Sequence, residues 1–163
     1  MTPAMMARAS ISEFFPMSIK RKEIVEAARS WIGTPYHHQA SLKNIGTDCL
    51  GLVRGVYREV YDQEAETPPD YSPDWAEATG FETMLKAANR HLDKQPPGRV
   101  AQGDVVIFRL RSGMVAKHAA IVSAPQKMIH AIEGAPVCEV VLSGWWKRHI
   151  AGVFSFPGVT DGF

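Results

Sequence analysis

The 163-residue sequence lacks the features that define several classes of protein. It has only two cysteines, Cys49 and Cys138, so a disulfide-stapled fold is excluded. Eighteen basic and seventeen acidic side chains leave a formal net charge of +1, which gives no electrostatic basis for binding nucleic acid or an anionic membrane surface. No apolar run approaches the roughly 20 residues that cross a bilayer. We therefore expect neither nucleic-acid binding nor membrane insertion.

The chain divides into an arm, one domain and a tail. Residues 1–17 have no hydrophobic period, so we predict an irregular N-terminal arm. This arm also lacks the unbroken apolar core of a secretory signal, and we expect the protein to be made in the cytoplasm without a signal peptide. Residues 18–157 carry the periodic elements of a single domain, and residues 158–163 are expected to be a C-terminal tail.

Helical patterns occupy the first half of the chain and strand patterns the second. Apolar spacing predicts helices over 18–33, with Ser18 as the N-cap, over about 49–61 and over about 75–92. After the turn cluster at 95–98, short apolar runs predict five strands. These strands are expected at 104–109, 117–123, 127–132, 137–142 and 151–156. The order predicts an α+β domain with N-terminal helices packed on an antiparallel β-sheet.

Cys49 is expected in the first turn of the second helix. On a helical wheel it falls within about 40° of Val53, Val56 and Val60, so its thiol points toward the packed face of the helix. The positive end of the helix dipole is expected to lower the thiol pKa and to favour the thiolate. A buried structural cysteine is the alternative that this stretch leaves open.

The same helix has a capping signal and two interior glycines. Asp48 or Thr47 can act as the N-cap. Gly51 and Gly55 lie one helical turn apart, and each costs about 1 kcal/mol relative to alanine in a helix interior. Their presence predicts that another backbone approaches this face closely.

Two histidines in the strand half are candidate partners of the thiol. If residues 123–125 form a three-residue loop, His118 and His130 pair directly across adjacent strands, with Cβ atoms about 4.5–5.5 Å apart. A slip of one residue would put them on opposite faces. The combination predicts Cys49 as a nucleophile, His118 as its base and His130 as the residue that orients the base. The backbone N–H of Cys49 is expected to help stabilise an oxyanion.

Five blocks of the sequence carry a family resemblance. They are Trp31-Ile32-Gly33-Thr34-Pro35-Tyr36, Asp48-Cys49-Leu50-Gly51-Leu52-Val53, Gly103-Asp104-Val105-Val106-Ile107-Phe108, His118-Ala119-Ala120-Ile121-Val122 and Met128-Ile129-His130-Ala131. In their order, and in the twelve-residue step from His118 to His130, they resemble the papain-like NlpC/P60 cell-wall peptidases over about residues 18–157. The longer stretches 33–39 and 48–55 look most like the phage and gene-transfer-agent tail branch.

The resemblance implies hydrolysis of an amide bond in the peptidoglycan stem peptide, typically the bond between γ-D-glutamate and the diamino acid. It implies the roles of nucleophile for Cys49, base for His118 and third residue for His130, without a metal or other cofactor. Tyr36 matches a family tyrosine that lies near the cysteine and contacts substrate. Asp48 matches an acidic residue that can contact the substrate amine.

The branch resemblance also implies partners and a location. Phage-like tail tip or hub proteins would deliver the enzyme to the wall, and we expect it to be incorporated in a virion or gene-transfer-agent tail. Such delivery would account for the missing signal peptide. Leu50, where many cell-wall members carry serine, borders the site and leaves substrate detail open.

Other functions stay open at this point. A structural tail-tip component would keep the fold with little turnover. A CHAP-like amidase would more often have Asn, Asp or Glu than His130 as its third residue. A circularly permuted acyltransferase or thioesterase is disfavoured because Cys49 precedes the histidines. A zinc site built from Cys49, His118 and His130 lacks the spacing of known zinc motifs.

Several further residues receive structural rather than catalytic interpretations. We expect His37-His38 to be solvated in a polar loop and Cys138 to be a small buried strand residue. Trp145-Trp146 is expected to be a core aromatic pair under the last strand, with a sugar-stacking platform as the less favoured alternative. Lys20-Arg21-Lys22 is expected to form a solvated first helical turn.

Overall fold

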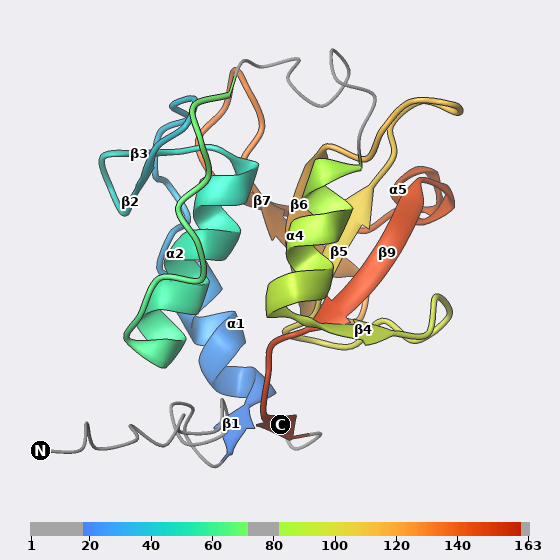
Figure 1. Ribbon diagram of the computed structural model, residues 1–163, viewed down its shortest axis with the longest axis horizontal. Helices are drawn as coiled ribbons and strands as arrows, with labels where there is room; N and C mark the ends of the chain where they lie inside the picture. Colours follow the sequence, from blue (N-terminus) through green and yellow to red (C-terminus); the bar gives the residue numbers. More distant parts are fainter. Residues whose placement is uncertain (1–17, 72–81, 161–163) are drawn as a thin grey trace, which may run out of the picture.

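The computed structural model describes residues 18–71 and 82–160, in which the helices come largely before the strands of the main sheet (Figure 1). The helices are α1 (Arg21–Arg29), α2 (Cys49–Tyr61), α4 (Thr83–His91) and α5 (Gly144–Arg148). The strands are β1 (Ile19–Lys20), β2 (Ser41–Leu42), β3 (Gly46–Thr47), β4 (Asp93–Gln95), β5 (Val105–Phe108), β6 (His118–Ala124), β7 (Lys127–His130), β8 (Cys138–Val141), β9 (Ile150–Ser155) and β10 (Val159–Thr160).

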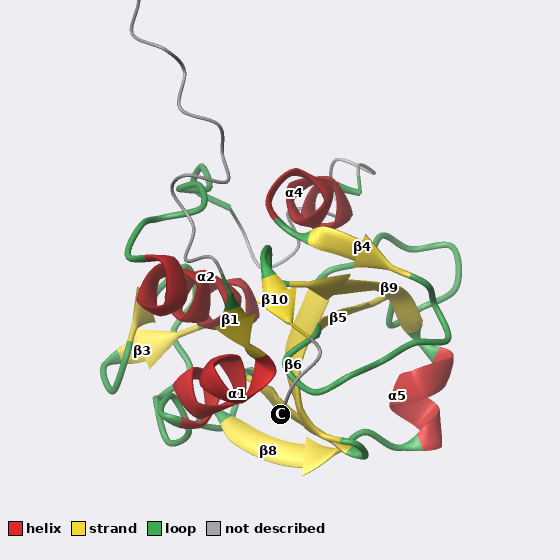
Figure 2. Cartoon of the chain, turned by 90° about the horizontal axis from the view of Figure 1, so that it is seen from below, coloured by secondary structure: helices red, strands yellow, loops and turns green. Residues whose placement is uncertain are grey.

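Six strands form one antiparallel sheet in the order β4-β9-β5-β6-β7-β8. Helices α1, α2 and α4 lie against one face, and α5 lies on the other side (Figure 2). The predicted α+β class, with N-terminal helices on an antiparallel sheet, is confirmed. Strand β6 is central in the sheet and begins at His118, whose side chain lies on the same face as Ala120 and Val122, the face that α5 covers.

The sheet is buried on both faces, which explains why its central strands are apolar throughout. Alternate residues of a strand face opposite ways. Ile107 and Ile121 join the core beneath the helices, whereas Val106 and Val122 join a second core that Trp146 of α5 helps to close. The run Val105–Phe108 is consequently buried at every position.

The N-terminus of the domain differs from the prediction. Ser18 does not cap the first helix, because β1 intervenes and pairs in parallel with β10. Helix α1 begins at Arg21, with Lys20 at the N-cap position. The pairing also joins the described part of the predicted 158–163 tail to the domain.

Arg21 is buried, so the expectation of a wholly solvated first turn is wrong. Its guanidinium Nη1 lies 2.6 Å from Oδ1 of Asp104, and their side chains are 10% and 1% exposed. Ser155 Oγ donates to the same carboxylate oxygen at 2.8 Å. This ion pair fastens α1 to the start of β5 and to β9.

The two glycines of α2 are explained by different neighbours. A Cβ atom at Gly51 would lie 1.9 Å from the carbonyl oxygen of Ala40, so a backbone approaches there as predicted. At Gly55 the close neighbour is a side chain, because a Cβ atom would lie 2.1 Å from Cζ2 of the buried Trp31 ring. Both glycines let the helix sit close to the layer beside it.

Some predicted segments fall outside the described residues. These are the arm over 1–17 and the first part, 75–81, of the third predicted helix, whose described part is α4. Within residues 18–71 and 82–160, no helix is long and apolar enough to cross a membrane.

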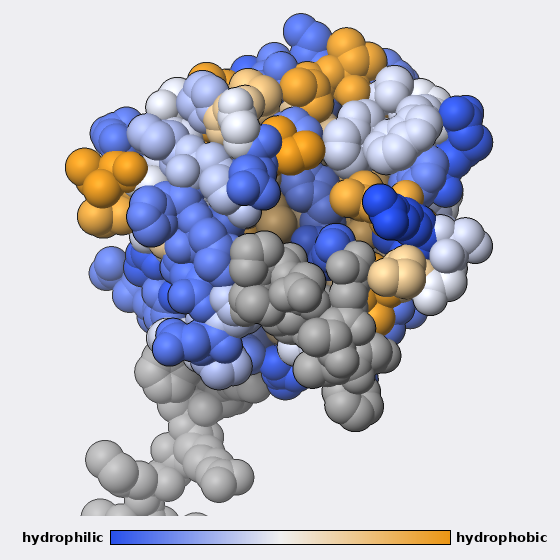
Figure 3. Space-filling view, turned by 90° about the horizontal axis from the view of Figure 1, so that it is seen from above, coloured by the Kyte–Doolittle hydropathy of each residue, from blue (hydrophilic) through white to orange (hydrophobic). Residues whose placement is uncertain are grey.

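In the view from above, hydrophobic groups stand separately among hydrophilic ones (Figure 3). Leu42 and Ile45 of the β2–β3 hairpin are 58% and 69% exposed.

Candidate active site

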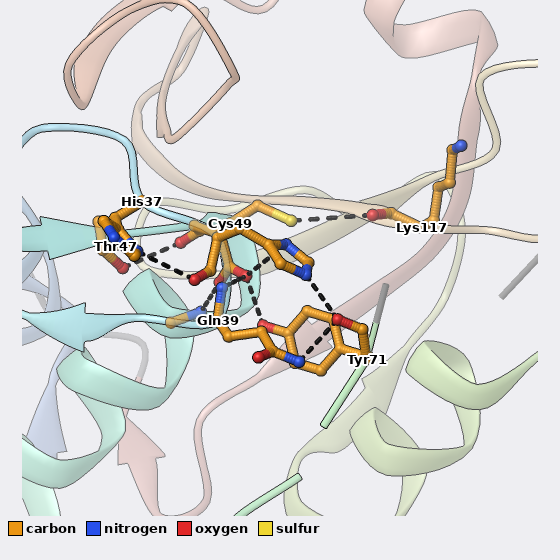
Figure 4. A network of polar contacts seen from close by, with 9 residues as sticks. His37, Gln39, Thr47, Cys49, Tyr71 and Lys117 are labelled. Carbon is orange, nitrogen blue, oxygen red and sulfur yellow. Dashed lines mark hydrogen bonds and ion pairs between the residues drawn. The ribbon is translucent and has the colours of Figure 1, made fainter. Parts of the chain in front are cut away.

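The thiol of Cys49 lies where α2 meets β6. Asp48 is the N-cap of α2, and its Oδ1 accepts a hydrogen bond of 2.7 Å from the backbone N–H of Gly51. This cap fixes Cys49 as the first helical residue. Its Sγ donates to the carbonyl oxygen of Lys117 at 3.7 Å (Figure 4). The sulfur is therefore held beside the start of β6, at the residue that precedes His118.

His118 and His130 come together, but in a different strand register from the predicted one. The predicted three-residue loop would pair Ile121 with Lys127, whereas Ile121 pairs with Ile129 across a tighter hairpin. A register shift of two residues keeps each side chain on its original face. His130 is consequently diagonal to His118, and Nε2 of His118 lies 3.0 Å from Nδ1 of His130.

Aromatic rings enclose the histidine pair, and both histidines are buried. The ring of Phe108 stacks on His118 with a centroid distance of 5.9 Å. Trp146 lies 5.5 Å from each imidazole centroid and 4.9 Å from Phe108. The prediction of a core role is thus confirmed for Trp146, but Trp145 is 47% exposed and stacks on His149.

Cys138 is a further neighbour of the histidine pair. It lies opposite His130 in the β7–β8 register and is partly exposed, rather than fully buried as expected.

The thiol and the imidazoles are neutral in the resting structure. Burial, with the nearby Asp48 carboxylate, raises the pKa of Cys49 to about 12. Burial, with the neighbouring His130, lowers the pKa of His118 to about 3, and burial also lowers the pKa of His130. The prediction of a resting thiolate is therefore wrong, because loss of solvation outweighs the helix dipole. In the described part of the chain, the thiol makes no hydrogen bond to either imidazole.

Tyr36 lies beside the segment that leads into α2. It forms an isolated parallel bridge with Thr47, the residue before the N-cap. Burial, followed by the electrostatic influence of Asp48, Cys49 and Glu133, raises the pKa of its phenol to about 12. Tyr36 and Glu133 thus border the same site, and no sequence motif pointed to Glu133.

The carboxylate of Asp48 accepts several hydrogen bonds from other groups of the protein. The residue is 4% exposed, and its Oδ2 accepts hydrogen bonds from the backbone N–H of Gln39, at 2.9 Å, and from the hydroxyl of Tyr71. The backbone carbonyl of Tyr71 in turn accepts from His38 Nε2 at 2.5 Å and from Gln39 Nε2 at 2.6 Å. His38 is therefore not simply solvated, whereas His37 is exposed.

Tyr71 reaches this site from a strap, which we define as residues 62–71. Glu64 of the strap is paired with Arg54 and Arg58 of α2 at 2.9 and 3.0 Å. Glu66 is paired with Arg90 and His91 of α4 at 2.8 and 2.5 Å. No sequence pattern pointed to Tyr71, because its approach to Asp48 depends on the strap folding back along α2.

A cavity of about 370 Å³ lies between α2, the strap and α4. Leu50 and Ala119 line it, and they are the direct neighbours of Cys49 and His118 in the chain. The cavity therefore lies beside the residues that follow Cys49 and His118 in the chain, but these two residues do not themselves line it. The wall opposite is formed by α4, including Met84, Ala87 and Ala88.

The described residues also bear on metal binding. In the ranges 18–71 and 82–160, no group of three or more His, Cys, Asp or Glu side chains is arranged to hold a metal ion. The zinc site considered from Cys49, His118 and His130 is not formed there.

Sequence comparison places the chain in a family. The sequence model of the NlpC/P60 family matches residues 33–155, which contain the thiol, both histidines, Tyr36 and Asp48. The chain belongs to the NlpC/P60 family. The gamma-DL-glutamyl hydrolase of Bacillus subtilis (strain 168) is 27% identical over 138 residues, which cover 84% of this chain and 30% of that protein. The chain thus spans under a third of the length of this relative.

Solved NlpC/P60 structures share the fold. The NlpC/p60 domain of the peptidoglycan hydrolase SagA superposes with a TM-score of 0.62 at 22% identity, covering 85% of this chain and all of that one. An NlpC/P60 family protein from Bacillus cereus ATCC 10987 superposes with a TM-score of 0.60 at 18% identity, covering 83% of this chain and 40% of that one. The expected papain-like NlpC/P60 fold is confirmed.

Proposed function

We propose that this protein is a cysteine peptidase that hydrolyses peptidoglycan stem peptides at the bond between γ-D-glutamate and the diamino acid. The observation that carries the proposal is the position of the Cys49 thiol at the start of α2, against the residue that precedes His118. His118 is itself hydrogen-bonded to His130. A nucleophile, a neighbouring base and a residue that orients the base are the parts that acyl transfer through a thiol requires.

The hydrogen bond between the imidazoles sets the tautomers that this mechanism needs. For His118 to accept the thiol proton at Nδ1, its Nε2 carries a hydrogen and donates to Nδ1 of His130. The hydrogen of His130 then lies on its own Nε2. In this arrangement His130 holds the ring of His118 and stabilises the imidazolium that forms.

Acylation transfers the thiol proton as the sulfur attacks. Sγ of Cys49 bonds to the substrate carbonyl carbon while His118 takes the thiol proton, and the carbonyl oxygen becomes an oxyanion that the backbone N–H of Cys49 stabilises. The C–N bond then breaks, and His118 donates its proton to the amine that leaves. The thiol of Cys49 and the imidazole of His118 both start neutral. Proton transfer during the attack therefore fits these charge states better than a thiolate–imidazolium pair that forms before the substrate binds.

Deacylation follows the same path in reverse. His118 removes a proton from water, the hydroxide adds to the thioester carbonyl, and the carbon–sulfur bond breaks. The thiol regains its proton from His118, and the product leaves as a carboxylic acid. No cofactor is needed for either half of the reaction.

The proposed substrate is supported by membership of the NlpC/P60 family and by the names of two related proteins. SagA is titled a peptidoglycan hydrolase, and the Bacillus subtilis relative is named a gamma-DL-glutamyl hydrolase. We assign substrate contacts to Tyr36 and to Asp48, both of which lie near the start of α2.

Mass spectrometry of muropeptides tests the proposal. Purified muropeptides are incubated with wild-type protein and with Cys49→Ala, whose folding is checked by circular dichroism. We expect fragments ending in L-Ala-D-Glu from the wild type only. Intact muropeptides in both samples, with folded wild-type protein, would overturn the proposed activity.

A structural component with the same fold and little turnover is the second candidate. This candidate is favoured by the hydrogen bond of the thiol, which the Cys49 side chain donates to the Lys117 carbonyl oxygen and not to an imidazole nitrogen. The muropeptide experiment separates the two, because only the peptidase consumes its substrate.

We further propose that the protein is carried on a phage-like tail, where tip or hub proteins bring it to the cell wall. The similarity of residues 33–39 and 48–55 to that branch supports this placement. Detection of the chain by peptide mapping of purified particles would test it, and its absence from particles of a producing strain would contradict it.

A further inference from the structure

Trp145 is the outer member of an aromatic pair on α5. Its partner Trp146 packs against the imidazoles of His118 and His130, whereas Trp145 is 47% exposed. The two indole rings meet perpendicularly, with centroids 5.0 Å apart and an interplanar angle of 88°. The proposed peptidase chemistry makes no use of this exposed ring.

The indole of Trp145 is held in one orientation. The ring of His149 stacks on it, with centroids 4.1 Å apart and an interplanar angle of 24°. His149 Nδ1 lies 2.6 Å from the carbonyl oxygen of Trp145, and the carbonyl of His149 accepts a hydrogen bond of 2.8 Å from the N–H of Arg109, at the end of β5. One face of the indole is thus covered and braced. A ring fixed in this way loses little conformational freedom when a ligand stacks on its other face.

The surface around Trp145 is charged. Lys147 and Arg148 of the same helix are exposed. Val141 is 60% exposed, but it lies on the face of β8 opposite to Val140, which joins the core that α5 covers. In the part of the chain that the structure describes, Trp145 is therefore a single aromatic ring between cations. Surfaces that dock other proteins are typically contiguous apolar patches.

A pyranose ring is the kind of ligand that suits a braced indole in polar surroundings. The face of an aromatic ring carries partial negative charge. The C–H groups on one side of a pyranose carry partial positive charge and form a flat, weakly apolar surface, so the two stack. The sugar hydroxyls then point outward, where Lys147 and Arg148 supply hydrogen-bond donors.

The exposed indole lies near the catalytic pair. The Trp146 centroid is 5.0 Å from that of Trp145 and 5.5 Å from that of His118, so two ring contacts connect the surface to the proposed base. In Figure 1, α5 and the beginning of α2 both lie toward the upper side of the molecule. Three residues of an extended peptide span about 10 Å. A stem peptide is therefore long enough to join a sugar on Trp145 to a bond at the site.

We propose that Trp145, backed by His149, is a carbohydrate-binding platform that stacks a sugar ring of the cell-wall glycan while a stem peptide of the same polymer occupies the active site. The choice of wall glycan rests on the proposed function. The binding of a sugar by Trp145 is measurable without any cleavage.

A sugar without a stem peptide tests the platform directly. The probe is the disaccharide of N-acetylglucosamine and N-acetylmuramic acid, titrated into wild-type protein and followed by NMR chemical shifts. We expect millimolar binding that Trp145→Ala weakens at least tenfold. Trp145→Phe keeps a smaller aromatic ring and should weaken binding by less. Ile45→Ala is the matched control, because it removes a side chain that is 69% exposed on the distant β2–β3 hairpin and should leave binding unchanged.

Cleavage of two matched substrates tests the connection to the active site. One is the disaccharide attached to L-Ala-γ-D-Glu-diaminopimelate, and the other is the same tripeptide with an N-acetyl group in place of the sugar. For wild-type protein we expect kcat/KM to be at least fivefold higher for the glycosylated substrate. Trp145→Ala should bring this ratio close to one, mainly by raising KM for the glycosylated substrate, and Ile45→Ala should preserve it.

The two experiments separate this inference from the proposed function. Absence of disaccharide binding, or equal binding by wild type and both Trp145 variants, would overturn the platform even if muropeptides are cleaved. A substrate ratio that Trp145→Ala does not change would overturn its connection to the active site. Binding that depends on Trp145, without cleavage of either substrate, would overturn the peptidase and leave the platform standing. Circular dichroism checks that each variant is folded.

Discussion

The imidazoles of His118 and His130 lie within hydrogen-bonding distance, 3.0 Å between Nε2 and Nδ1, although the two residues are diagonal rather than opposite across β6 and β7. Diagonal positions on one face of an antiparallel pair are within reach of long or aromatic side chains. The ring of His118 therefore bridges a gap that a smaller side chain would not. Under the proposed mechanism, this geometry leaves Nδ1 of His118 to accept the thiol proton.

Substitution of His118 and of His130 should distinguish the role of general base from the role of the residue that orients the base. We expect His118→Ala to lower kcat by roughly 10²–10⁴-fold, the usual contribution of a general base. His130→Asn should lower kcat by less, because an amide oxygen can still accept the hydrogen bond from Nε2 of His118. Initial rates of muropeptide cleavage measure both. Equal rates for His130→Ala and wild type would disprove the role of the third residue.

Thiol alkylation probes the base without a substrate. Iodoacetamide should modify Cys49 at pH 7 with assistance from His118, so we expect His118→Ala to slow this reaction at least tenfold. Cys138, which is also partly exposed, serves as the internal control and should react at an unchanged rate. Peptide mapping by mass spectrometry follows both cysteines. Equal alkylation of Cys49 in the two proteins would argue against proton transfer to His118.

Stability should fall as the pH drops below about 6.5. The pKa of His118 is lowered to about 3, and that of His130 is also lowered, so the unfolded chain binds more protons than the folded one in this range. His118 contributes a slope of up to about 1.4 kcal/mol per pH unit in the free energy of unfolding, and His130 adds to it in the same direction.

Urea unfolding between pH 4.5 and 7 measures this slope. The double variant His118→Gln, His130→Gln lacks both titrating groups, and its profile should be flatter than that of the wild type. Glutamates with lowered pKa, such as Glu66, contribute to both profiles near pH 4.5, so the difference between the two profiles isolates the histidines. Parallel profiles for the two proteins would contradict the neutral histidine pair.

The ion pair between Arg21 and Asp104 should matter more than a surface pair on the same helix. Asp104→Ala leaves the buried guanidinium of Arg21 without its carboxylate, a change that typically costs about 3–5 kcal/mol. Lys22 and Glu26 form an exposed pair on α1 at 3.9 Å, and Glu26→Ala should cost under about 0.5 kcal/mol. Chemical denaturation measures the free energy of unfolding of both variants. Similar losses of stability would contradict the larger effect expected for the buried pair.

Gly55→Ala should destabilise the protein although alanine is the better helix former. The new methyl group would meet the Trp31 ring, which is 1% exposed and has little room to move. Overpacking of this kind costs about 1–3 kcal/mol. Gly98→Ala is the matched control, because no heavy atom lies within 4 Å of its added Cβ. Thermal unfolding should show a lowered Tm for Gly55→Ala only.

Features that depend on local periodicity and capping could be predicted from the amino-acid sequence alone. Period-two alternation put His118 and His130 on one face, and a two-residue error in register did not change that face. Asp48 was identified as a possible cap, and the helix that begins at Cys49 was placed correctly. The α+β class followed from the order of helical and strand patterns.

The protonation of the thiol and the contacts of Asp48 depend instead on packing between distant parts of the chain. Helix position alone favours a thiolate at Cys49, but burial depends on what packs over the sulfur and reverses that preference. Tyr71 meets Asp48 because the strap folds back across α2, a contact between residues 23 apart that no short-range pattern encodes. Local interactions set the elements, and long-range packing set the charge state and covering of the site.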